Sequence, residues 1–154
     1  MPKATPQDLT DIGFAAQQFG GPADFGVESA GGFLYDILLA VGLEVRARAG
    51  ATIYDAATSD AAEDSDQLNF YRLRDAEKYL AAAVLWQRRI ARLDADTMIG
   101  RSADGKADLL REYRLNRANY LTDADMKLAE VTGTTRTGGA SMTVVESGPY
   151  PPVL

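Results

Sequence analysis

Residues 74–96, RDAEKYLAAAVLWQRRIARLDAD, make up most of the longest helix that the sequence predicts, over residues 67–93. The stretch holds the chain's only tryptophan and three consecutive alanines. Its apolar residues recur at intervals of three and four, which places them on one stripe of a helix. The stripe consists of Ala76, Tyr79, Leu80, Ala83, Trp86, Ile90 and Leu93. We therefore expect the small and aromatic side chains to face protein and the arginines to face outward.

Two further long helices are predicted, over residues 33–49 and 106–131. The apolar positions of the first are Leu34, Ile37, Leu38, Val41 and Val45. Those of the second alternate almost strictly by three and four, and the row is Leu110, Tyr113, Arg117, Leu121, Ala124, Leu128 and Val131. Gly50 and Gly133 follow the two helices and are natural stops. The interior Gly42 indicates a close approach of another helix.

The remaining segments predict the ends and the connections of the bundle. Thr5, Pro6 and Asp8 mark the start of a short helix over residues 6–19. Glycine is frequent in the following arm, and residues 51–66 form an acidic connector. The expected fold class is all-α, a small bundle of three long helices with a short N-terminal helix. We expect residues 1–32 to be a short N-terminal helix and a glycine-rich arm, 33–132 the bundle and 133–154 an extended C-terminal arm.

Composition excludes several classes of function. The chain of 154 residues has no cysteine and no histidine, which removes disulfides, thiolate nucleophiles, imidazole bases and the usual zinc ligands. Its net charge of −6 disfavours a general nucleic-acid binder, which is normally basic. No stretch approaches the roughly 20 apolar residues that cross a bilayer. The N-terminus has no secretory signal, so we expect the protein to stay where it is made.

The acidic connector is the one cluster that could hold a cation or serve a carboxylate-dependent hydrolase. Its acids are Asp55, Asp60, Glu63, Asp64 and Asp66. Their spacing does not match an EF-hand, and no apolar pocket is indicated that would raise the pKa of one of them. The favoured interpretation is a solvated connector that caps the next helix. We predict no catalytic residue, no metal site and no cofactor.

Basic and aromatic residues give the candidate binding positions. Arg88, Arg89 and Arg92, with Arg101 beyond them, could touch phosphate or an acidic partner, although cations are also common near a helix C-terminus. Arg117 lies in an otherwise apolar row, so we expect it to meet an acid across a subunit boundary. Aromatic residues at helical spacing more often form a core or an interface than a base-stacking platform.

The C-terminal arm supplies the other predicted partner-binding residues. Met142, Thr143, Val144 and Val145 are strand-prone, and the chain offers no second strand of comparable quality. We expect them to pair with another chain, and we expect the end of the arm to dock in a partner's pocket. The docking residues are Tyr150, Val153 and Leu154. Deleting residues 138–154 should leave the helices and their thermal unfolding almost unchanged and abolish assembly.

The order of features over residues 33–131 resembles that of the head–tail connector, or adaptor, proteins of tailed bacteriophages. The points of likeness are an amphipathic first helix ending near a glycine (LLAVGLEVRARAGATIYDAA), a polar connector, a second long helix (AEKYLAAAVLWQRRI), a third long helix and a non-helical C-terminal arm. The resemblance implies a ring, most often of twelve copies, in the neck of the virion. Such a subunit is made in the host cytoplasm.

The resemblance also implies the partners. They are other copies of the chain, the portal protein, and a tail or second neck protein. DNA would pass through the lumen without specific binding, which suits an acidic subunit, and no membrane would take part. The alternative is a cellular helical adaptor module without enzymatic activity. Ring assembly or incorporation into a virion would separate the two hypotheses.

Overall fold

The computed structural model describes residues 1–19, 32–98 and 105–133, and these residues are helical with short connections. The elements are α1 (Pro6–Asp11), the 3₁₀ helix η1 (Ala16–Phe19), α2 (Phe33–Ala49), α3 (Ala51–Ala56), α4 (Asp64–Met98) and α5 (Lys106–Thr132). No strand lies within the described residues. The all-α bundle with three long helices is confirmed.

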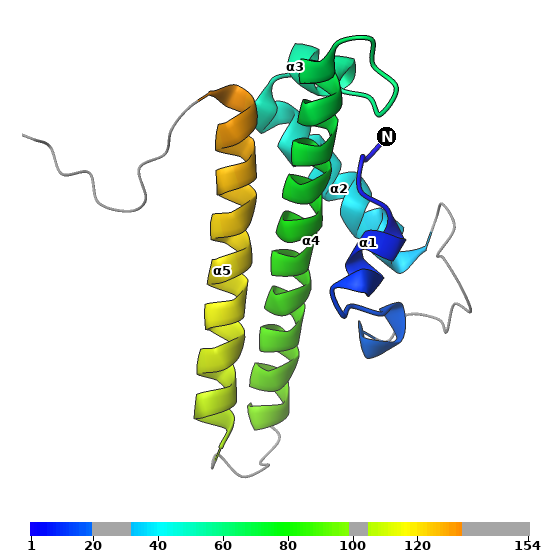
Figure 1. The fold of residues 1–154 in the computed structure, drawn as a ribbon. Helices are drawn as coiled ribbons and strands as arrows, with labels where there is room; N and C mark the ends of the chain where they lie inside the picture. The colour runs from blue at the N-terminus through cyan, green and yellow to red at the C-terminus, as the bar shows by residue number, and fades with distance from the viewer. Residues whose placement is uncertain (20–31, 99–104, 134–154) are drawn as a thin grey trace, which may run out of the picture.

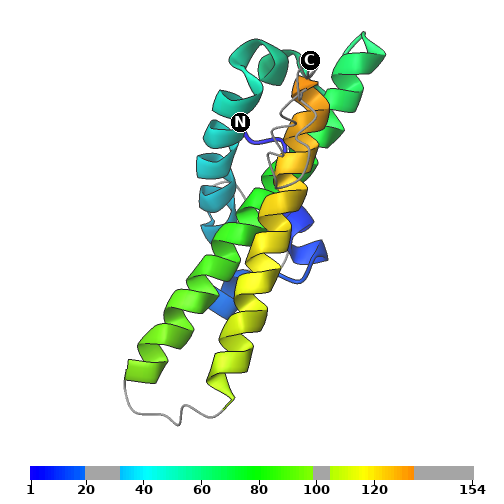
Figure 2. The ribbon, with the colours of Figure 1, turned by 90° about the vertical axis from the view of Figure 1, so that its left-hand side faces the viewer.

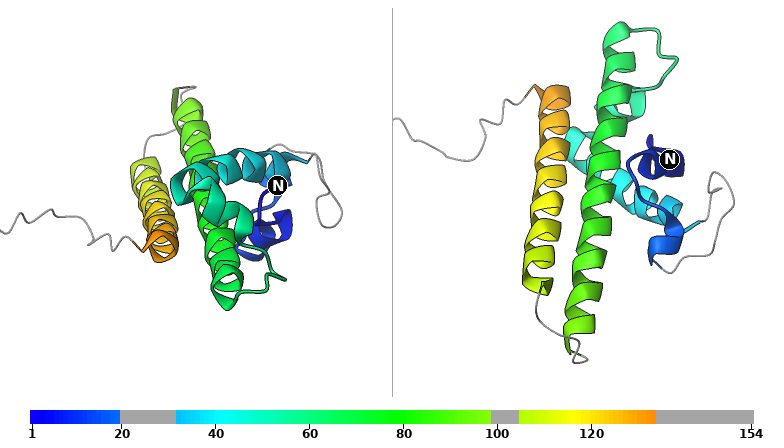
Figure 3. Two further views of the ribbon diagram at one scale, coloured as in Figure 1. Left: turned by 90° about the horizontal axis from the view of Figure 1, so that it is seen from above. Right: turned by 60° about the horizontal axis from the view of Figure 1, so that its bottom comes forward.

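Helices α4 and α5 run antiparallel and form a long hairpin (Figure 1). Helix α2 crosses this hairpin, and α3 continues from it beside the N-terminal part of α4 (Figure 2). The N-terminal segment with α1 lies on the side of α4 away from α5, as the view from above also shows (Figure 3). Helix α4 is therefore the central element of the bundle.

The alanine run explains how α4 can be covered on several sides. Leu80, Ala81, Ala82 and Ala83 are all buried. Because consecutive residues of an α-helix are about 100° apart, four consecutive buried positions cover most of its circumference. Small side chains at three of them let the neighbouring elements approach the α4 backbone closely.

The apolar rows predicted for the three long helices face the core of the bundle. All positions of the stripe on α4 are buried or half-buried, and so are the residues of the α5 row. The α2 row is fully buried. The predicted bounds 33–49 agree with α2, and 106–131 with α5 to within one residue. The helix predicted over 67–93 is longer, since α4 runs from Asp64 to Met98.

Two predictions about the short elements are wrong. The helix expected over residues 6–19 is interrupted, because Gly13 has a φ of +95°, which an α-helix does not accept. Phe14 is buried immediately after this break. The connector expected over residues 51–66 begins with the helix α3, whose Tyr54 is buried. Gly50, with a φ of +92°, ends α2 and turns the chain into α3.

Candidate interaction surface

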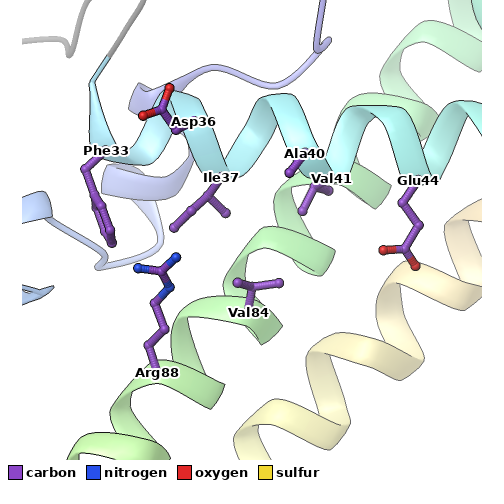
Figure 4. Close-up of a pocket in the computed structure, with 8 residues that line it drawn as sticks. All are labelled: Phe33, Asp36, Ile37, Ala40, Val41, Glu44, Val84 and Arg88. Atoms are coloured by element: carbon purple, nitrogen blue, oxygen red, sulfur yellow. The ribbon is translucent and has the colours of Figure 1, made fainter.

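A groove lies where α2 crosses α4 and α5. It consists of two adjoining hollows of about 380 and 340 Å³ that share Glu44, Val84 and Arg88. The α2-side hollow is lined by Phe33, Asp36, Ile37, Ala40, Val41, Glu44, Val84 and Arg88 (Figure 4). The α5-side hollow is lined by Glu44, Leu80, Ala83, Val84, Gln87, Arg88, Arg117 and Leu121. The groove is thus an apolar surface with charged groups at its edges.

The charged groups of the groove are only partly paired. Arg88 points between α2 and α4, with its guanidinium 4.9 Å from the centre of the Phe33 ring (Figure 4). Among the described residues, neither Arg88 nor Arg117 has an ion pair within 4.0 Å, whereas Glu44 lies 3.7 Å from Arg48. Such a surface can bind apolar side chains and a carboxylate of a partner.

The outer side of α2 carries a second apolar surface. Its inner residues are buried against α4, yet Leu39 is 43% exposed and Leu43 is 65% exposed. These two leucines are four residues apart and therefore neighbours on one face of the helix. Helix α2 thus has two apolar faces, of which the described residues cover only one.

The predicted arginine patch has two distinct environments. Arg89 lies over the rings of Phe14, Phe19 and Trp86, at 5.0, 5.2 and 4.7 Å from their centres. It donates a hydrogen bond to the side chain of Gln18, while Arg92 donates to the Gln18 carbonyl oxygen. Arg89 and Arg92 therefore hold the N-terminal segment against α4. Arg88 lies apart from this contact and faces the groove.

The aromatic residues form a continuous cluster between elements. Phe14 contacts Trp86 and Tyr120, at 5.9 and 6.3 Å between ring centres. The Trp86 ring also lies 5.0 Å from that of Tyr113 on α5. These rings join the N-terminal segment, α4 and α5, as the sequence-based interpretation of core or interface aromatics expects.

Sequence reasoning missed a fully buried carboxylate on α4. Glu77 is 0% exposed and accepts hydrogen bonds from the backbone N–H groups of Lys3 and Ala4, at 2.6 and 2.7 Å. The Tyr54 hydroxyl donates to the other carboxylate oxygen. Burial raises the pKa of Glu77, and the hydrogen bonds from Tyr54, Ala4 and Lys3 oppose that rise.

Glu77 anchors the start of the chain with help from two neighbours. The Lys3 ammonium lies 4.3 Å from the centre of the Tyr54 ring. A Cβ at Gly42 would lie 3.3 Å from Pro2 and 3.4 Å from the Glu77 carboxylate. The predicted close approach at Gly42 is therefore made by the N-terminal segment and a side chain of α4. We call residues 1–4, together with Glu77 and Tyr54, the N-terminal anchor.

A pattern in the sequence could have revealed the anchor. Leu73, Glu77, Ala81 and Leu85 form a row at intervals of four, and each is 0% exposed. A charged residue in an otherwise apolar row is the signal that singled out Arg117 on α5. On α4 this row lies beside the predicted stripe of Ala76, Leu80, Ala83 and Ile90 and shares none of its residues, so the stripe alone does not indicate a buried carboxylate.

An ion pair between Asp8 and Arg74 attaches α1 to α4. The Arg74 Nε lies 3.1 Å from Asp8, whose carboxylate also accepts the Thr5 N–H at 2.7 Å. Burial opposes ionisation of Asp8, but the contacts with Arg74 and Thr5 outweigh it and hold the pKa of Asp8 below its usual value.

The substitution Asp8→Asn is expected to lower the free energy of unfolding by about 1–2 kcal/mol at neutral pH, a modest loss because the Arg74 side chain is 38% exposed. A lowered pKa in the fold means that the stabilisation is present above the ordinary value of 3.8 and is lost as the pH falls below it. Thermal unfolding at several pH values checks this. A gap between wild type and variant that widens on acidification would contradict it.

The other predicted site residues fall into two groups. Arg101 and the C-terminal residues Met142, Val144, Val145, Tyr150, Val153 and Leu154 lie outside the described residues. The acids of residues 55–66 do not gather: Asp55 pairs with Arg46 at 2.9 Å, and no group of three potential metal ligands occurs within the described part of the chain. None of the described helices combines the length and apolar character needed to cross a bilayer.

Comparison of the chain with protein-family models, with curated proteins and with solved structures finds no match.

Proposed function

We propose that the protein is a structural subunit that assembles with copies of itself, as the ring-forming head–tail connector of a tailed bacteriophage does. The observation that carries the proposal is the second apolar face of α2, with Leu39 and Leu43 exposed on a helix whose opposite face is already buried. A helix with two apolar faces is normally covered on both. In a ring, a neighbouring copy supplies the second cover.

The groove beside α2 and the charge of the chain also support assembly. The groove beside α2 offers apolar lining and arginines without acid partners within the described residues. A contact between two different surfaces of identical subunits closes into a ring when the rotation permits it. The resemblance of residues 33–131 to connector proteins, and the net charge of −6, which suits a passage for DNA, add the specific virion role.

The test measures the molar mass of the full chain over a range of concentrations, by size-exclusion chromatography with light scattering, together with negative-stain electron microscopy. We expect multiples of the 16.6 kDa chain and ring-shaped particles. The substitution Leu43→Glu is expected to abolish assembly, because it places a charge in the apolar contact.

A matched control separates this effect from a general loss of solubility or folding. Leu115 on α5 is 60% exposed, close to the 65% of Leu43, so Leu115→Glu changes a similarly exposed leucine on another helix. We expect this variant to assemble as the wild type does. A wild-type chain that stays monomeric at every concentration, yet binds one cellular protein, would instead favour the adaptor module.

A further inference from the structure

The α5-side hollow of the groove has an excess of positive charge. Arg88 and Arg117 line it against the single carboxylate of Glu44. Arg117 is half-buried in the row that packs on α4, and no described acid lies within ion-pair distance of it. A partly desolvated guanidinium is most stable beside a carboxylate, so the hollow suits an acidic group from outside the described residues.

The α2-side hollow suits apolar side chains of a bound segment, whereas the α5-side hollow suits its acidic group. The walls of the α2-side hollow include Phe33, Ile37, Val41 and Val84, so it favours apolar side chains. The two hollows adjoin, and together they fit a short segment that carries apolar residues next to one carboxylate.

The C-terminal segment of the chain has this composition. Residues 142–154, MTVVESGPYPPVL, contain one acid, Glu146, and no base. Val144 and Val145 precede the acid and Tyr150 follows it, while three prolines reduce the conformational entropy lost on binding. The 21 residues from 134 to 154 can span roughly 70 Å when extended, which is enough to reach another copy.

We propose that the groove between α2, α4 and α5 binds residues 142–154 of a neighbouring copy, with Glu146 beside Arg117 and Arg88 and the apolar residues against Phe33 and Ile37. The proposal rests on the proposed function, since it adds a second contact between copies to the one at the outer face of α2. Each copy gives one segment and receives one. When the segment is passed on from copy to copy, rather than exchanged between two, the contact is head-to-tail and generates a ring or a filament.

Charge reversal in the full-length chain tests the contact. Arg117→Glu and Glu146→Arg should each place like charges together, and each variant alone should run as a 16.6 kDa monomer in light scattering. An equimolar mixture of the two should recover the wild-type mass, because every segment then meets a groove of opposite charge. The double variant Arg117→Glu, Glu146→Arg should also assemble. Arg114→Glu, at an exposed position of the same helix, is the matched control and should leave assembly intact.

The possible outcomes separate a failure of the proposed contact between groove and segment from a failure of the proposed assembly function. If the wild type assembles and both single variants assemble equally well, the groove is not the binding site of the segment, although the proposed function stands. If both variants are monomeric with wild-type circular dichroism, but neither the mixture nor the double variant recovers the oligomer, the pairing of Glu146 with Arg117 is also wrong. A wild type that is monomeric at every concentration overturns the proposed function and this contact with it.

Discussion

Replacing Glu77 with alanine is expected to lower the free energy of unfolding by about 3–5 kcal/mol, the largest effect we expect of a polar substitution among the described residues. The carboxylate is 0% exposed and accepts from the N–H groups of Lys3 and Ala4 and from the Tyr54 hydroxyl. Alanine would leave the N–H groups of Lys3 and Ala4 without their acceptor, whereas the Tyr54 hydroxyl keeps a bond to the Met1 carbonyl oxygen. Each unsatisfied buried donor costs about 1–3 kcal/mol, and the space vacated by the side chain adds to the loss. Urea unfolding followed by circular dichroism measures the loss.

The conservative variant Glu77→Gln tests whether hydrogen bonding is the cause. Its amide oxygen can accept one or two of the same bonds, but it has no charge, so we expect a smaller loss of about 1–2 kcal/mol. The N-terminal anchor should also detach first in Glu77→Ala, which faster hydrogen exchange at Lys3 and Ala4 would report. A loss below about 1 kcal/mol for Glu77→Ala would show that water or another acceptor replaces the carboxylate.

The long helices could be predicted from the sequence because their signals are local. The spacing of Leu34, Ile37, Leu38 and Val41 fixes both the existence of α2 and the face that it buries. The bounds of the short elements depend on the backbone torsions of single residues, and the spacing of apolar residues carries no information about those torsions. Gly13 lies within a helical pattern, yet its positive φ ends the regular structure there.

The candidate site was predicted only in part, for a related reason. Arg117 can be recognised because its charge interrupts an otherwise apolar row on one helix. Glu77 interrupts a row that is more deeply buried, but that row becomes visible only when the N-terminal segment and α2 are known to cover a second face of α4. Pairing of residues far apart in the chain, such as Glu77 with Lys3, is a tertiary property and leaves no spacing signal.

The substitution Ala81→Leu is expected to lower the free energy of unfolding by about 2–3 kcal/mol, because the surrounding side chains leave no space for a larger residue. Ala81 is 0% exposed, and its neighbours Leu80, Ala82 and Ala83 are also buried, so α4 is enclosed around this turn. Leucine adds three carbon atoms within the row that contains Glu77. Either α2 or the N-terminal anchor must then move away from α4, which weakens the packing of several residues at once. Thermal and urea unfolding measure the change.

Ala91 on the same helix provides the matched control, since it is exposed. Ala91→Leu changes helix propensity by the same small amount but meets no neighbour, so we expect a change within about 0.5 kcal/mol. If Ala81→Leu were as well tolerated as Ala91→Leu, the elements around α4 would not be closely packed at the alanine run. The central position of α4 would then be wrong, and with it the explanation for three consecutive alanines beside the chain's only tryptophan. A loss of stability confined to Ala81→Leu would instead show that the bundle requires small side chains at the alanine run, because the neighbouring elements pack closely on α4 there.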